Sequence, residues 1–348
     1  MLLTPGPTAM PPSVREAMSE ELINPDVDPR FADRYDAVLD KLGTVFGTDD
    51  EVVVMGGEGI LGLEAAVAST VAPGDRVLCL SNGPYGDGFT DFVESYGGES
   101  TLVDADYDDS LPLADLERTL AGGEYDVATM VHCETPTGTL NELSPALDLF
   151  DEHDVLTVVD AVSSLGGTPV PTDRIDICLG ASQKCFSAPP GLAIASVSAA
   201  AWERIEDRDP ASLYTNLLPW HGAEQPYPYT HLTTLVVALD EALDLLLGEG
   251  LDAVYDRHQE VAAHCRARGR DLGLEPYPGP ERSSPTVTAF SVPGRATELQ
   301  DRLREDHDVT LSTGFGDLAA DVLRVGHMGY NADLDRVERA MDALAAER

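Results

Sequence analysis

Lysine is almost absent from this sequence. Among its 22 basic residues, only Lys41 and Lys184 are lysines, and the others are arginines. With 62 acidic residues, the formal net charge is −40. A surface of that sign repels nucleic acids and acidic membranes, so we expect neither as a partner. Abundant acid with little lysine is typical of proteins that work in concentrated salt, and it predicts the cytoplasm of a salt-accumulating halophile.

The sequence also lacks the cysteine patterns of disulfide-rich and zinc-binding proteins. Its five cysteines form no Cys-x-x-Cys pair and no cysteine–histidine ligand spacing, so we expect reduced thiols and no bound metal. The start, MLLTPGPTAMPP, does not have the basic region and apolar stretch of a secretory signal. No apolar run approaches the length of a membrane span, so we expect no transmembrane segment.

From residue 51 onward, apolar segments alternate with helical patterns. Nearly continuous apolar runs predict buried strands at 51–55, 76–80, 126–132, 155–159, 175–179 and 192–198. Several of the intervals between them suit helices, including 60–71, 87–96 and 144–153. This alternation predicts an α/β fold with a mostly parallel sheet that helices cover on both faces.

The pattern changes after a strong helical segment at 231–250. A long helix at 251–271 is followed by a strand, a helix, a strand and a final helix, which predicts a smaller C-terminal α+β domain. We therefore expect an N-terminal segment at 1–20, a large domain at 21–250 and a small domain at 251–348. The first forty or so residues are expected to run across the surface of both domains.

The loop after the first predicted strand is rich in glycine. Residues 57–62, Gly-Glu-Gly-Ile-Leu-Gly, match the dinucleotide-binding pattern Gly-x-Gly-x-x-Gly. The acid near the required distance, Asp75, lies in a turn before the next strand, where a ribose ligand is not expected. The loop therefore predicts an anion site for one phosphate at a helix N-terminus, with purely structural glycines as the alternative.

Four further residues follow predicted strands. Tyr85 lies in SNGPYGDG, Thr135 in HCETPTG, Asp160 at the end of an apolar strand, and Lys184 in GASQKCFSAPPG. Ligands of open parallel sheets bind at the carboxyl ends of the strands, so these side chains are expected at one site. A buried aspartate needs a partner, either a protonated ring nitrogen or the backbone of the following segment. A lysine, unlike an arginine, can lose its proton and act as a nucleophile.

A phosphate site, an aromatic ring, a buried carboxylate and a lysine amine are what pyridoxal 5′-phosphate requires. The chain resembles the class V aminotransferases of the aspartate-aminotransferase fold, fold type I, and most closely the alanine–glyoxylate/serine–pyruvate aminotransferase branch. The resemblance runs from LLTPGPT through VVDAVSSLGG and GASQKCFSAPPG to VLRVGHMGYN. It implies pyridoxal 5′-phosphate as cofactor, a homodimer, and a large and a small domain.

The resemblance also implies roles for individual residues. It makes Lys184 the catalytic residue that holds the cofactor as a Schiff base, and it assigns substrate binding to Arg324 and to Gly6 in the N-terminal segment. Its implied cofactor contacts are Glu58, Gly59, Ile60, Tyr85, Thr135, Asp160, Val162 and Gln183, with Tyr227 and Thr230 contributed by the second subunit. A glutamate is unexpected beside a phosphate dianion, so at position 58 we expect the backbone N–H to bind.

The resemblance therefore implies an aminotransferase that moves the amino group of a small L-amino acid, such as alanine or serine, to glyoxylate or pyruvate. A lyase or a cysteine desulfurase on the same fold is an alternative, although the expected carboxylate-binding region RVGHMGYN contains no cysteine. The intact Lys184, Asp160 and Arg324 disfavour a protein without catalytic activity. The missing ribose acid disfavours an NAD-dependent dehydrogenase.

Overall fold

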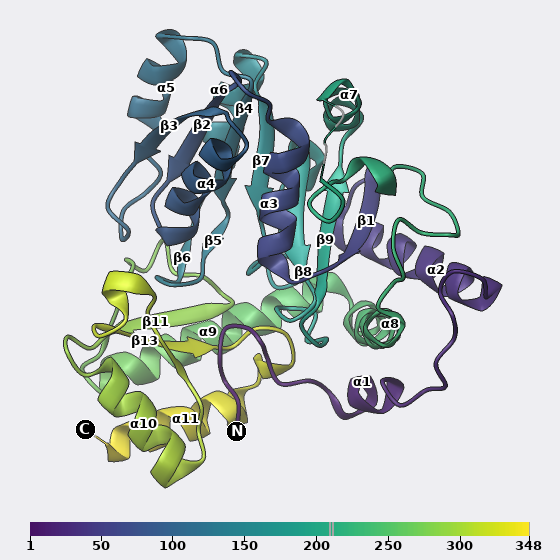
Figure 1. The fold of residues 1–348 in the computed structure, drawn as a ribbon. Coiled ribbons are helices and arrows are strands. Elements are labelled where there is room, and N and C mark those ends of the chain that lie inside the picture. Colours follow the sequence, from purple (N-terminus) through teal and green to yellow (C-terminus); the bar gives the residue numbers. More distant parts are fainter. Residues whose placement is uncertain (209, 211, 348) are drawn as a thin grey trace.

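The computed structural model describes residues 1–208, residue 210 and residues 212–347. Within them, seven strands form a sheet in the order β1–β9–β8–β7–β4–β2–β3 (Figure 1). Strand β9 is antiparallel to both of its neighbours, and the other neighbouring pairs are parallel. The strands are β1 (Glu51–Gly56), β2 (Arg76–Ser81), β3 (Glu99–Asp104), β4 (Val127–Val131), β7 (Leu156–Asp160), β8 (Ile177–Ala181) and β9 (Leu192–Val197). The expected mostly parallel α/β sheet is confirmed.

Helices pack against both sides of this sheet. Helices α3 (Gly59–Thr70) and α4 (Pro84–Ser95) contact each other and lie in front of the sheet in Figure 1. Helix α6 (Ser144–Glu152) packs on β7 and on α5 (Leu113–Ala121), and α7 (Ala199–Arg208) packs on α3. Helix α8 (Thr233–Glu249) connects the large sheet to the smaller C-terminal part of the chain. None of the helices in the described ranges is long and apolar enough to span a membrane.

A second sheet belongs to the C-terminal part of the chain. Its antiparallel order is β10 (Glu275–Pro276), β11 (Val287–Ser291), β13 (Val322–Gly326) and β12 (Ser312–Thr313). Helices α9 (Leu251–Asp271), α10 (Ala296–His307) and α11 (Leu334–Ala346) close its apolar cluster. The start of the chain joins this sheet, because the Leu3 N–H donates to the Thr310 carbonyl at 3.0 Å and the Gly326 N–H donates to the Leu3 carbonyl at 2.7 Å. Residue 348, the end of the expected small domain, lies outside the described residues.

The first forty residues contact both parts of the chain, as expected, and they also form a core-facing helix that the sequence did not indicate. After the short helix α1 (Pro12–Ala17), residues 29–46 form helix α2 (Pro29–Phe46). Phe31, Tyr35, Val38 and Leu42 are buried on one face of α2, which packs on α8 and β1. Their spacing of three and four residues is the helical pattern that identifies a core-facing stripe.

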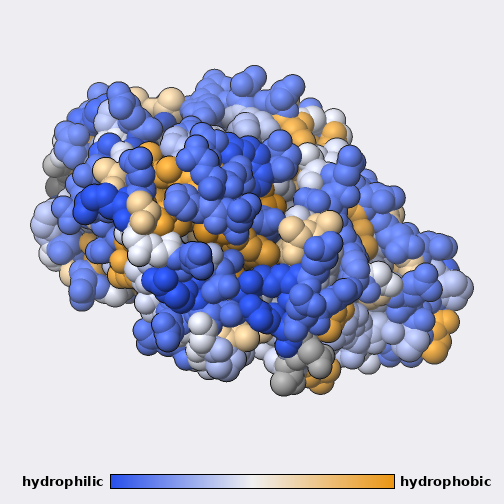
Figure 2. Space-filling model, turned by 90° about the horizontal axis from the view of Figure 1, so that it is seen from above, coloured by the Kyte–Doolittle hydropathy of each residue, from blue (hydrophilic) through white to orange (hydrophobic). Residues whose placement is uncertain are grey.

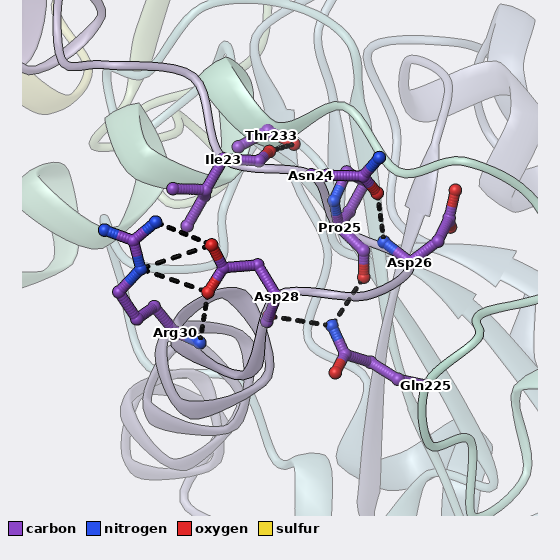
Figure 3. Close-up of polar contacts among 8 residues, drawn as sticks. All are labelled: Ile23, Asn24, Pro25, Asp26, Asp28, Arg30, Gln225 and Thr233. Carbon is purple, nitrogen blue, oxygen red and sulfur yellow. Dashed lines mark hydrogen bonds and ion pairs between the residues drawn. The ribbon is translucent and has the colours of Figure 1, made fainter.

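The start of α2 is fixed by local polar contacts (Figure 3). The Asp28 carboxylate accepts from the Arg30 N–H at 3.0 Å and pairs with the Arg30 guanidinium. An aspartate before a proline is a common helix start, because its carboxylate satisfies a free N–H and the proline has none to satisfy. The Gln225 amide donates to the carbonyls of Pro25 and Asp28 at 2.6 and 3.0 Å, so residues 23–28 are tied to the 225–233 stretch.

Acidic side chains dominate the surface. Figure 2 shows a face that is mostly hydrophilic, with hydrophobic residues gathered toward its middle. Basic residues are shared among several acids: the Lys41 amine lies 2.6 Å from both Asp240 and Asp244, where it joins α2 to α8. Since 62 acids face 22 basic residues, most acidic charges have no basic side chain to pair with.

We predict that the free energy of unfolding rises steadily with KCl concentration. The Debye length falls from about 10 Å at 0.1 M salt to about 3 Å at 1 M, so repulsion among the surface acids is screened. Urea titrations followed by circular dichroism over a KCl series measure this. Sucrose at matched osmolality is the control, since it acts without screening charge. A free energy of unfolding that does not change with KCl would contradict the prediction.

Candidate active site

Most of the residues selected from the sequence meet at one edge of the large sheet. They follow the carboxyl ends of β1, β2, β4, β7 and β8 and surround a cavity of about 290 Å³. The cavity is lined by Gly6, Glu58, Gly59, Ile60, Tyr85, Thr135, Asp160, Val162, Gln183 and Lys184, among others. A larger hollow of about 710 Å³ lies elsewhere, between α2, β1 and the turn at 220–223. The chemistry-bearing residues thus gather in the smaller of the two.

Lys184 follows β8 and lies against the N-terminal segment. Its Nζ donates to the Pro5 carbonyl at 2.7 Å. Gly6 has a φ of +96°, and a Cβ there would lie 2.5 Å from the Lys184 Cδ, so only glycine lets the segment pass this close. Burial lowers the pKa of Lys184 to about 8, helped by the charge of Arg324 and opposed by that of Asp160. A substantial fraction of the amine is therefore neutral near pH 8, the form that acts as a nucleophile or a base.

Asp160 ends β7 and is buried, with 6% of its surface exposed. Its Oδ1 accepts from the Val162 N–H at 2.8 Å. Its Oδ2 has no hydrogen-bond partner among the described residues. Burial raises the pKa of Asp160 to about 6, opposed by the Val162 N–H and by the charge of Lys184. A positively charged donor in the cavity would complete the environment of this carboxylate.

The N-terminus of α3 forms another wall of the cavity. Helix α3 begins at Gly59, where the first backbone N–H groups of a helix are free to bind an anion. Glu58 precedes it, and its side chain makes no capping hydrogen bond and is exposed. Asp75 lies at the opposite end of the sheet and pairs with Arg204 and Arg208 at 2.9 Å, which agrees with a structural role and not with a ribose contact.

Tyr85 lies in the first turn of α4, where its ring lines the cavity and stacks on Phe315 at 6.5 Å between centroids. A fully buried carboxyl group, Glu134, fixes this turn. It follows β4 in the short strand β5 (Cys133–Glu134), which pairs with β6 (Thr139–Leu140). It accepts from the Gly86 N–H at 2.7 Å and from the Tyr85 N–H at 3.2 Å. Burial raises the pKa of Glu134 to about 8, opposed by these two N–H groups.

Glu134 was not selected from the sequence. It lies two residues after the predicted apolar strand at 126–132, as Asp160 lies at the end of another, so the same positional signal identifies it.

Arg324 reaches the site from β13 of the small sheet. Its Nε donates to the Thr313 carbonyl at 2.6 Å and its Nη1 to the Thr135 carbonyl at 3.2 Å. Its Nη2 has no hydrogen bond to any residue that the structure describes. Burial lowers the pKa of Arg324 to about 10, which leaves the guanidinium charged at neutral pH. The cavity therefore lies where the two sheets meet, with one guanidinium nitrogen free for a carboxylate.

Tyr227 and Thr230 do not line the cavity of their own chain. Tyr227 is 6% exposed and packs against Phe31, Tyr35 and Trp220. Thr230 is exposed and donates to the Asp26 carboxylate at 3.1 Å. The phosphate contacts that the resemblance implies for these two residues therefore require a second copy of the chain.

The ring-binding end of the cavity fits the expected cofactor. Gln183 is 6% exposed, and its buried Oε1 has no hydrogen-bond partner among the described residues. With the Asp160 carboxylate, the Tyr85 ring and the Lys184 amine, it surrounds a space suited to a protonated pyridine ring that carries an aldehyde. The other end matches less well, because a carboxylate, Glu58, stands beside the N–H groups that would bind the phosphate.

We predict that Glu134→Gln lowers the free energy of unfolding by about 1–3 kcal/mol near pH 5, because an amide –NH2 would face one of the two N–H donors. Between pH 4.5 and about 8 the folded carboxyl keeps a proton that the unfolded one has lost, so wild-type stability falls as the pH rises. The variant does not titrate there, so its deficit should shrink toward pH 8. Urea titrations at several pH values measure both effects.

The matched control is Glu152→Gln, which removes the same charge from an exposed position on α6. It should change stability by less than about 0.5 kcal/mol. A Glu134→Gln deficit that grows with pH, or one no larger than that of the control, would contradict the role given to Glu134.

Comparisons with known proteins agree with this geometry. The family described as Aminotransferase class-V matches residues 1–331. An uncharacterized aminotransferase of Methanocaldococcus jannaschii is 34% identical over 100% of this chain and 94% of its own length. The pyridoxamine–pyruvate transaminase of Mesorhizobium japonicum is 34% identical over 98% of this chain and 90% of its own length. The crystal structure of an alanine–glyoxylate aminotransferase from Nostoc sp. has a TM-score of 0.95 at 31% identity, and the match covers 99% of this chain and 94% of that chain.

The family match spans nearly the whole chain, and the likeness to the Nostoc structure confirms the expected fold type I architecture. Aminotransferases of class V use pyridoxal 5′-phosphate, which agrees with the ring-binding end of the cavity. The chain therefore belongs to the class V aminotransferases, a family of pyridoxal-phosphate-dependent enzymes.

Proposed function

We propose that the enzyme transfers the amino group of a small L-amino acid, such as alanine or serine, to a small 2-oxo acid, such as glyoxylate or pyruvate. The observation that carries this proposal is the single guanidinium of Arg324 beside the cavity, with its Nη2 free. One such group suits substrates with one carboxylate.

The described residues supply the parts of this reaction. The bound cofactor provides the electron sink, and the protein provides binding, orientation and proton transfer. With the ring bound, the Asp160 carboxylate would hold its nitrogen in the protonated form, and the Tyr85 ring would pack against its face. The Arg324 guanidinium orients the substrate carboxylate. The Lys184 amine, with a pKa of about 8, would accept the α-proton of the amino donor and would donate a proton to the α-carbon of the product when the 2-oxo acid is aminated.

The names of relatives support the choice of acceptor. Besides the pyridoxamine–pyruvate transaminase, they include an L-aspartate–glyoxylate and an alanine–glyoxylate aminotransferase, at 31% and 32% identity. These names have a small 2-oxo acid in common and differ in the amino donor. At identities near 30%, the names of relatives do not determine the amino donor of this chain, so we infer the donor from the residues of the site.

A second candidate donor is pyridoxamine, which one observation favours. Pyridoxamine has a neutral hydroxymethyl group where its phosphorylated form has a dianion. The carboxylate of Glu58 stands beside the N-terminus of α3, at the end of the cavity where that substituent would lie. A neutral hydroxyl can donate a hydrogen bond to a carboxylate, whereas a phosphate dianion is repelled by it.

The alternative of a cysteine desulfurase lacks a reactive thiol. All five cysteines are buried. Burial raises the pKa of Cys133 to about 11, and it raises the pKa of Cys185, the neighbour of Lys184, further still. A desulfurase needs a thiolate on a mobile loop, and these thiols are neutral and packed.

We also propose that the active form is a homodimer with shared sites. Leu22 and Val27 are 71% and 75% exposed on the segment that carries Asp26 and lies next to Thr230. A second copy placed over this segment would bury these apolar groups and bring Thr230 to the other chain's cavity. Light scattering in concentrated KCl tests this: a dimeric mass supports it, and a fully active monomer contradicts it.

The composition supports a salt-accumulating cytoplasm as the place where the enzyme works. In concentrated salt the distant surface charges are screened, whereas the contacts of Lys184 and Arg324 within the cavity act over a few Å. An anionic substrate can then approach a protein of net charge −40.

The donor can be identified from half-reactions in multimolar KCl. We predict that L-alanine or L-serine converts the visible absorbance of the ring aldehyde to that of the ring amine, and that glyoxylate or pyruvate reverses the change. L-aspartate should react at least about tenfold more slowly, because its second carboxylate finds no second guanidinium. The measurement is the absorbance spectrum after each donor is added alone.

Arg324→Gln should weaken binding of the amino acid and leave binding of the ring aldehyde nearly unchanged. Arg282→Gln, on an exposed loop contact to the Asp108 carbonyl, is the matched control and should change neither. No response to any of the donors, or a response to aspartate alone, would contradict the proposed function.

A further inference from the structure

The end of the cavity formed by α3 has a carboxylate where a phosphate would need positive charge. Glu58 is the residue before the first turn of α3, lines the cavity and makes no side-chain capping bond. The charged side chains lining the cavity are two carboxylates, Glu58 and Asp160, and one amine, Lys184. Lys184 is held near Pro5 at the N-terminal side by its hydrogen bond of 2.7 Å. The phosphate end therefore has free N–H groups and a nearby negative charge.

A second copy of the chain would not correct this imbalance. The two residues that the resemblance would bring from it, Tyr227 and Thr230, are both neutral. Thr230 already donates to a carboxylate, Asp26, at 3.1 Å. Residues 23–28, which include Asp26 and Asp28, are tied to the stretch that carries Thr230. Neither Tyr227 nor Thr230 would bring a positive charge to the phosphate end of the cavity.

The other end of the same cavity has polar groups that lack hydrogen-bond partners among the described residues. The Gln183 Oε1 is buried and has no partner among the described residues, and Gln183 as a whole is 94% buried. Asp160, which lines the same cavity, also has one carboxylate oxygen without a hydrogen bond among the described residues. These groups point to a protonated heteroaromatic ligand, independently of the helix N-terminus. The cavity thus selects a pyridoxal-type ring at one end and disfavours a dianion at the other.

We propose that the site takes the phosphate-free ring, pyridoxamine or pyridoxal, as an exchangeable substrate, with Glu58 accepting a hydrogen bond from its hydroxymethyl group. This rests on the proposed function, because the amino group still passes to a small 2-oxo acid bound by Arg324. Glu58 is then the residue that determines specificity between the phosphate-free and phosphorylated forms. Its carboxylate and the α3 N–H groups together suit a hydroxyl, which both donates and accepts.

The reaction balances without any further reagent. The aminomethyl carbon of pyridoxamine loses two electrons and a proton and becomes the aldehyde carbon of pyridoxal. The keto carbon of pyruvate or glyoxylate gains both and becomes the α-carbon of alanine or glycine. One water is released when the amine condenses with the keto group, and one is consumed when the products separate. Lys184 carries the proton between the two carbons.

The test compares the two forms of the ring on the whole enzyme in concentrated KCl. Dissociation constants for pyridoxal and for pyridoxal 5′-phosphate are measured by absorbance titration. In the wild type we expect pyridoxal to bind at least about tenfold more tightly than its phosphate ester, because the carboxylate and the dianion repel each other at contact distance. Incubation of pyridoxamine with pyruvate should then release pyridoxal and alanine in equal amounts.

Glu58→Gln should reverse the preference, with tighter binding of pyridoxal 5′-phosphate and weaker binding of pyridoxal. Glu58→Ala provides a second variant, with the same gain for the phosphate ester and a larger loss for pyridoxal. The matched control is Glu117→Gln, which removes one negative charge from an exposed position on α5 and should leave the ratio of the two constants as in the wild type.

Two outcomes separate this inference from the proposed function. If the wild type binds pyridoxal 5′-phosphate more tightly than pyridoxal, and L-alanine converts the bound phosphorylated form, the inference is wrong and the proposed function stands. If neither form of the ring supports amino transfer to pyruvate or glyoxylate from any donor, the proposed function is wrong as well. The wild-type ratio decides the inference even if the Glu58 variants do not fold.

Discussion

The site depends on one lysine amine held in a buried cavity within reach of a buried aspartate. Lys184 is the only lysine near the sheet edge, since Lys41 lies between α2 and α8. Burial lowers the pKa of Lys184 and raises that of Asp160, so each group moves toward its neutral form. A ring that is positively charged at its nitrogen and carries an aldehyde satisfies both groups at once.

Around that pair, the chain uses few positive charges. The formal charge is −40, and the groups that offset it at the site are Lys184, Arg324 and the N-terminus of α3. Each acts over contact distance, where screening by salt is small, whereas the surface acids act over longer distances that salt does screen. The acidic charge that suits concentrated salt therefore lies mostly on the surface, whereas the positive groups that bind substrate lie at the site. Two acids also lie at the site: Asp160, which is buried, and Glu58, which is exposed at the start of α3.

Much of the fold and most of the site follow from the sequence. Buried strands give continuous apolar runs, so β1, β2, β4, β7, β8 and β9 are visible in the sequence, and the residues after all of these strands except β9 mark the site. Strand β3 was missed because it is an edge strand whose side chains, apart from Val103, are exposed or half-buried, so its residues form no apolar run. Helix α2 was missed because its stripe from Phe31 to Leu42 stands among acids and arginines.

Other features cannot be derived from local pattern. The contact of Gly6 with Lys184 joins residues that are far apart in the sequence, and the support of Tyr85 by Glu134 depends on how two loops meet. The location of Tyr227 in an aromatic cluster of its own chain follows from packing of α2, not from the spacing of its motif.

The most direct test of the account is to locate the lysine that reacts with the ring. The enzyme is incubated with pyridoxal or its phosphate in concentrated KCl, reduced with borohydride, digested and analysed by peptide mass spectrometry. We predict that the reduced adduct lies on Lys184 and that Lys41, held between Asp240 and Asp244, is unmodified. An adduct on Lys41 or the N-terminal amine alone, or no adduct with either form of the ring, would contradict the account.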